Sequence, residues 1–158
     1  MKENDKELNL QDLIESRFWE HKSIKDLSQK EWEALCDGCG KCCFRKYVEG
    51  HFKNKRTYLT RIACNCLNLE NGLCSCYLNR FAIQKDCIQL NVRKLKNFKW
   101  LPETCSYRDF YEKGVLPDFH PLLNGGSFEN VPKICNPVHE KDVDFNDNSY
   151  MDFVIEIQ

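Results

Sequence analysis

Apolar residues in the first third of the chain recur at helical spacing. Between residues 10 and 20 they fall on one side of a helix, at Leu10, Leu13, Ile14 and Phe18. A second short helix is predicted to begin at Ser28, because Ser28 and Glu31 have the spacing of a capping box and Trp32 and Leu35 follow. Both predicted helices precede the first cysteine of the chain.

Shorter elements are predicted further along. Residues 57–63 are β-branched or aromatic and predict a strand. The dipeptide Asn71-Gly72 predicts a tight turn between two Cys-x-Cys pairs, and therefore a small hairpin. Turn residues dominate after residue 117, and within the acidic tail only 153–155 has the composition of a strand.

Two more short helices are expected, one from Asn91 through Phe98 and one opened by Pro102 that runs to about Lys113 and stops at Gly114. Together these elements predict an α+β fold, with short helices, a small hairpin or sheet and irregular cysteine-rich connections. We expect a single domain over residues 1–127, with its core in 18–127. Residues 128–158 form an acidic C-terminal extension that is either packed on this domain or partly flexible.

Cysteine is the residue whose use departs most from the ordinary, with 11 in 158 residues. Such a density indicates a disulfide framework in a secreted domain, and metal ligation or redox chemistry in a cytosolic protein. The odd count, and a charged N-terminus without an apolar h-region, favour the second class and a cytoplasmic location. No apolar run is long enough to span a membrane.

The net charge of −1 conceals a strongly basic central segment. Residues 36–100 carry thirteen Lys and Arg against four Asp and Glu, whereas the segments on either side are acidic. Ten of the eleven cysteines lie between 36 and 105, so the cysteine-rich and basic segments coincide. Basic neighbours lower thiol pKa values and offset the negative charge of a thiolate–metal centre. Nucleic-acid binding is the rival interpretation, but neither basic patch contains a recognisable reading motif, so we do not expect it.

The densest cysteine cluster runs from Cys36 through Cys39 and Cys42 to Cys43. In a Cys-x-x-Cys turn two sulfurs point at one metal ion, and Gly38 and Gly40 permit the backbone that such a turn needs. If the segment is helical instead, at about 100° per residue, three of the thiols still fall within about 60° of one another. In either geometry, several of the thiols converge on a common site.

The remaining cysteines form two Cys-x-Cys pairs and three single positions, and no His accompanies them at zinc-finger spacing. A thiolate-only site suits zinc or an iron–sulfur cluster and excludes magnesium and calcium. The first three cysteines reproduce the opening of a bacterial ferredoxin run, but position 46, where its fourth Cys would stand, is Lys. A fourth ligand must come from a distance. We favour a [4Fe-4S] cluster narrowly over zinc, and the number of thiols predicts two sites, or one site plus structural thiols.

Several motifs, in order between residues 18 and 127, resemble those of the bacterial YcgN-type proteins of the CxxCxxCC cysteine-cluster family. They are Phe18-Trp19-Glu20, the 27–33 segment, the 36–43 cluster, Ala63-Cys64, Cys74-x-Cys76 with Arg80, Asp86-Cys87, the 100–108 segment and His120-Pro-Leu-Leu. The resemblance implies a small cytoplasmic protein organised around a zinc- or iron-binding centre. The cysteines that fall on those of the family are the predicted metal ligands: Cys36, Cys39, Cys42, Cys43, Cys64, Cys74, Cys76, Cys87 and Cys105. Cys66 and Cys135 do not match the family and are left out of this set.

Two classes of function follow. The first is a metal-binding protein that holds an iron–sulfur cluster or zinc through thiolates, with its protein partner and exact role undefined. The second is a thiol-dependent redox enzyme or redox partner, in which a nucleophilic Cys needs a nearby base. His120 is the best candidate for that base because it belongs to the resemblance. The sequence contains no phosphate loop, dinucleotide motif or metalloprotease signature.

Overall fold

Two short capped helices open the part of the chain that the computed structural model describes, namely residues 9–51, 54–95, 100–144 and 149–157. Helix α1 (Leu10–Ser16) begins at Asn9, which forms a capping box with Asp12. Arg17 then adopts a left-handed conformation, so the helix predicted for 10–20 breaks into α1 and a 3-10 turn at Phe18–Glu20. Helix α2 (Gln29–Ala34) has the predicted capping box of Ser28 and Glu31.

The later helices are shorter than the sequence predicted. Helix α4 (Ser106–Lys113) stops at Gly114, which has a φ of 70°, as expected. Its predicted start at Pro102 is wrong, because the N–H of Cys105 closes a separate turn on the Pro102 carbonyl and α4 begins after it. Helix α3 (Arg80–Ile83) was not predicted. Residues 91–95 of the predicted 91–98 helix form a turn capped by Asn91, and 96–99 lie outside the described residues.

The described strands form a mixed four-stranded sheet around β2 (Arg56–Ala63), the strand predicted for 57–63. Strand β1 (Phe44–Glu49) pairs antiparallel with one edge of β2. On the other edge β4 (Val154–Ile157) pairs antiparallel near the start of β2, and the two-residue β3 (Val138–His139) pairs parallel near its end. The chain after residue 128 therefore supplies two strands of the sheet. Strands β1 and β3 were not predicted, since β1 contains four charged or polar positions and β3 is too short to show a pattern.

The predicted turn at Asn71-Gly72 is present. Gly72 has a φ of 77°, and a β-bridge joins Leu67 to Cys74 across the turn. The N–H of Ser75 donates to the carbonyl of Cys66 at 2.8 Å, which extends the pairing toward both Cys-x-Cys pairs. The turn therefore brings the two pairs together on neighbouring arms.

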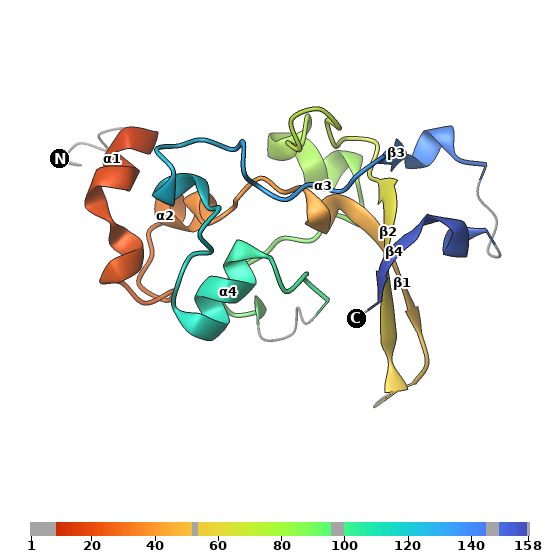
Figure 1. Cartoon of the computed structure of the whole chain (residues 1–158), viewed down its shortest axis with the longest axis horizontal. Coiled ribbons are helices and arrows are strands. Elements are labelled where there is room, and N and C mark those ends of the chain that lie inside the picture. Colours follow the sequence, from red (N-terminus) through yellow and green to blue (C-terminus); the bar gives the residue numbers. More distant parts are fainter. Residues whose placement is uncertain (1–8, 52–53, 96–99, 145–148, 158) are drawn as a thin grey trace.

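Helices α1, α2 and α4 lie at one end of the described molecule and the sheet lies toward the other, with α3 between them (Figure 1). The larger core cluster joins α1, α4 and the segments around them, and includes Phe18, Leu35 and Leu101. A smaller core cluster is formed by residues of the sheet and of the hairpin, and it includes Phe44 and Leu59. This arrangement confirms the predicted α+β class. None of the described helices is both long and apolar enough to cross a bilayer.

Candidate metal centre

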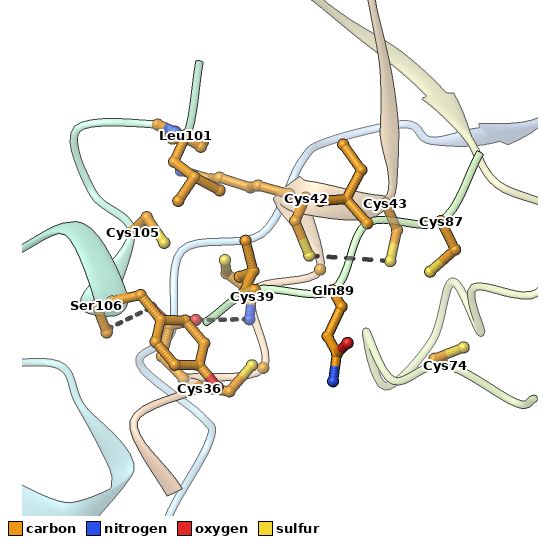
Figure 2. A pocket seen from close by; sticks show the side chains of 18 of the residues that line it. Cys36, Cys39, Cys42, Cys43, Cys74, Cys87, Gln89, Leu101, Cys105 and Ser106 are labelled. Carbon is orange, nitrogen blue, oxygen red and sulfur yellow. Dashed lines mark hydrogen bonds between the residues drawn. The ribbon is translucent and has the colours of Figure 1, made fainter. Parts of the chain in front are cut away.

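A cavity of about 840 Å³ opens between the helical end and the sheet, and cysteine is prominent in its wall. Its lining includes residues from α2, β1, the hairpin and the start of α4. Figure 2 shows the thiols of several of these residues turned toward the same space. Eight of the nine predicted ligands line the cavity: Cys36, Cys39, Cys42, Cys43, Cys64, Cys74, Cys87 and Cys105.

The first four of these cysteines lie on a tight loop rather than on an α-helix. Gly38 and Gly40 have φ values of 71° and 69°, which a residue with a side chain rarely adopts, so the turn geometry is the correct alternative of the two considered. A 3-10 turn at Lys41–Cys43 leads directly into β1. The loop therefore carries its thiols around one side of the cavity.

Asp37 fixes this loop against the start of α4. Its buried carboxylate accepts the N–H of Cys39 at 2.9 Å and the hydroxyl of Ser106 at 2.7 Å. Ser106 follows Cys105, the N-cap residue of α4, so the hydrogen bond brings to the loop a cysteine that is 62 or more positions away in the sequence. Asp37 and Ser106 were not predicted from the sequence, although an Asp two residues before a loop N–H is a known turn signal.

The hairpin supplies the thiols on the other side. The sulfurs of Cys74 and Cys76 are 3.7 Å apart, and the neighbouring thiol of Cys66 raises the pKa of Cys76. The N–H of Cys66 donates to the sulfur of Cys64 at 3.5 Å. Cys76 is the one predicted ligand that does not line the cavity, yet it touches a cysteine that does.

Most of these thiols have raised pKa values, chiefly because surrounding protein desolvates the thiolate. Burial raises the pKa of Cys36 to about 12 and that of Cys105 to about 11, with neighbouring thiols and Asp37 adding to the effect. Cys36 is solvent-accessible at the cavity wall, but the dense protein around it still desolvates the charged form. The pKa of Cys42 is lowered, by a hydrogen bond with Cys43 and by the charge of Lys46.

Cations stand beside the thiols and would offset their charge. The Lys46 ammonium donates to the carbonyls of Phe44 and Lys41 at 2.9 and 3.0 Å and lies 4.9 Å from the centre of the Trp100 ring. Arg45 pairs with Glu140, and its buried Nε has no hydrogen-bond partner among the described residues. Burial raises the pKa of Cys64, and the charge of Arg45 partly opposes this rise.

The donor set fits zinc or an iron–sulfur cluster, since both are held by thiolates and both are stabilised by nearby positive charge. Within the described ranges, no three or more Cys, His, Asp and Glu side chains are close enough together to hold a metal ion. The thiols surround a common space without meeting at one point. Metal binding would therefore have to draw them inward.

His120 does not act as a base for any of these thiols. It is fully buried outside the cavity lining, its Nδ1 accepts the N–H of Leu122 at 3.1 Å, and its Nε2 donates to the carbonyl of Leu35 at 3.2 Å. Because Nδ1 is an acceptor, the ring is neutral with its proton on Nε2. Burial lowers the pKa of His120, which keeps the ring in this form. Its role is to anchor the residue before Cys36.

The two cysteines that were left out of the predicted set have different surroundings. Cys66 is buried in the hairpin and contacts Cys76, whereas Cys135 is exposed and does not line the cavity. None of the eleven cysteines forms a disulfide.

Comparison with known proteins identifies several bacterial relatives. The chain is 50% identical over 133 residues to a UPF0260 protein of Haemophilus influenzae strain PittEE, which covers 82% of this chain and 89% of the relative. It is 51% identical over 134 residues to one of Pasteurella multocida, with coverage of 82% and 90%. A UPF0260 protein of Klebsiella pneumoniae is 44% identical over 113 residues, with coverage of 72% and 75%. No family model and no solved structure matches the chain.

Proposed function

The chain belongs to the UPF0260 family, and we propose that it is a metal-binding protein whose cysteine thiolates hold zinc or an iron–sulfur cluster. The observation that carries the proposal is the convergence of eight cysteines on one cavity from four separate stretches of the chain. Thiols used only as small buried hydrophobes have no reason to line the same space. The resemblance to the YcgN-type CxxCxxCC proteins supports the same conclusion.

The chain's own groups account for three requirements of such a centre. The glycines of the 36–43 loop let the backbone turn, Asp37 holds the loop to α4, and Lys46 and Arg45 supply fixed positive charge. Metal binding displaces protons from the thiols, and nearby cations favour that displacement. When bound, a cluster would supply electron transfer and zinc would supply structural cohesion.

Purification under anaerobic and aerobic conditions tests the proposal and separates the two metals. We expect stoichiometric metal in elemental analysis of the anaerobic protein. A [4Fe-4S] cluster absorbs broadly at the blue end of the visible spectrum and is bleached by dithionite, whereas zinc leaves the protein colourless. Cys39→Ser should lower the metal content, and Cys135→Ser, which changes an exposed thiol outside the cavity, should not. A wild-type protein that retains no metal and takes up none on reconstitution would refute the proposal.

One observation favours the alternative of thiol chemistry. Cys42 combines a lowered pKa with exposure to solvent inside the cavity, which are the two properties of a reactive thiol. Rapid labelling of Cys42 by iodoacetamide in the metal-loaded protein would support this function. A Cys42 that resists labelling until the metal is removed is a ligand.

A further inference from the structure

We propose that the nine predicted ligands form two separate centres, which meet at the Cys42–Cys43 pair. This inference rests on the proposed metal-binding function and adds the grouping of the thiols. The loop group is Cys36, Cys39, Cys42 and Cys105. The hairpin group is Cys43, Cys64, Cys74, Cys76 and Cys87. Five thiols in the second group exceed the four that a tetrahedral ion needs, and Cys76, which does not line the cavity, is the one that remains outside its coordination shell.

The loop group provides the fourth ligand that the sequence lacks. Cys36, Cys39 and Cys42 have the spacing of a cluster-binding run, and Lys46 stands where a fourth Cys would follow. The structure instead brings in Cys105 from the start of α4. The Asp37 carboxylate fixes this juxtaposition, because it bonds to the N–H of Cys39 and to the hydroxyl of Ser106.

The arrangement in Figure 2 separates the two groups. Cys105, Cys39 and Cys36 lie on one side of the Cys42–Cys43 pair, and Cys87 and Cys74 lie on the other.

The hairpin presents the thiol of Cys74 to the cavity. The sulfur of Cys76 is 3.7 Å from that of Cys74 but lies outside the cavity lining. The β-bridge between Leu67 and Cys74 holds the Cys64 arm beside them.

Adjacent cysteines are then divided between the centres. The sulfurs of Cys42 and Cys43 are 4.0 Å apart, but Cys42 lies on the side of Cys39 and Cys105, whereas Cys43, which directly precedes β1, lies on the side of Cys87. One peptide bond would thus connect two centres in a single cavity. This arrangement gives each of the two consecutive cysteines a different function.

Cobalt(II) binding to the full chain under anaerobic reducing conditions tests this grouping. Elemental analysis should find two cobalt ions per wild-type chain, and both ions should contribute to the sulfur-to-cobalt charge-transfer absorption. Cys105→Ser and Cys87→Ser should each retain one ion. The double variant Cys39→Ser/Cys105→Ser, within one group, should also retain one. Cys105→Ser/Cys87→Ser, across the groups, should retain none, and Cys135→Ser should retain two.

The adjacent cysteines Cys42 and Cys43 give the most discriminating comparison. The double variant Cys39→Ser/Cys42→Ser should retain one ion, whereas Cys39→Ser/Cys43→Ser should retain none. Equal counts for these two double variants would overturn the grouping, as would a wild-type chain that binds a single ion. A wild-type chain that binds no ion would instead overturn the proposed function itself. Circular dichroism checks folding, and Cys36→Ser replaces Cys105→Ser if the latter variant does not fold.

Discussion

Replacement of His120 offers a quantitative test of how the cysteine loop is anchored. The side chain has no exposed surface and makes two hydrogen bonds to backbone groups. Its Nδ1 accepts the N–H of Leu122, and its Nε2 donates to the carbonyl of Leu35, the residue before Cys36. His120→Ala removes both bonds and leaves the two backbone groups buried without these partners.

The expected loss follows from these contacts. An unsatisfied buried backbone group costs about 1–3 kcal/mol, and the cavity left by the ring adds to this. We expect His120→Ala to lower the free energy of unfolding by about 3–5 kcal/mol. His120→Asn places an acceptor near the position of Nδ1 and should lose about 1–3 kcal/mol, for the Leu35 bond alone. His120→Gln places a donor near Nε2 and should lose about 0.5–2 kcal/mol, for the cap alone.

Urea unfolding of the metal-loaded protein, followed by circular dichroism, measures these differences. The slope of the unfolding free energy against urea should be the same in all four proteins, so that the midpoints report stability. A loss below about 1 kcal/mol for His120→Ala would refute the reasoning. So would equal losses for the Ala, Asn and Gln variants, because the two bonds would then not be separable.

The same variants isolate a pH dependence. The pKa of His120 is lowered by burial below the value of about 6.5 in an unfolded chain, so the unfolded state binds the proton more readily. Its contribution to stability is therefore complete above about pH 6.5 and declines as the pH falls below it. The difference in stability between wild type and His120→Asn should shrink with acidification. Thiolate protonation affects both proteins alike and cancels in this difference.

Three further predictions concern the cavity. Complete metal removal under reducing conditions should lower the melting temperature by more than about 10 °C, since even 3 kcal/mol corresponds to about that shift in a chain of this size; unchanged melting would contradict it. Gly72→Ala would place a Cβ 2.7 Å from the Gly38 carbonyl and should weaken cobalt binding. Gly125→Ala, with a similar positive φ but open space around it, should not. Lys46→Met should lower cobalt affinity at least several-fold in a competition titration, whereas Lys85→Met, on an exposed residue outside the cavity, should leave it unchanged.

Local features of the fold could be predicted from the sequence alone. The capping box of Ser28 and Glu31, the helix stop at Gly114 and the turn at Asn71-Gly72 each depend on residues within a few positions of one another. The strand β2 could also be predicted, because its β-branched and aromatic residues are contiguous. The prediction of an all-thiol donor set also rests on the sequence alone, on the number of cysteines and on the scattered positions of the histidines.

Only the tertiary structure decided which cysteines meet. The bond from Asp37 to Ser106 spans 69 positions and the bond from His120 to Leu35 spans 85, and no spacing in the sequence indicates either. Strands β1 and β3 gain their pairing from β2 rather than from their own polar or very short sequences. Distant thiols thus share one cavity because buried hydrogen bonds and the sheet hold their segments together. Sequence spacing determines chemistry within a turn, and packing determines which turns face one another.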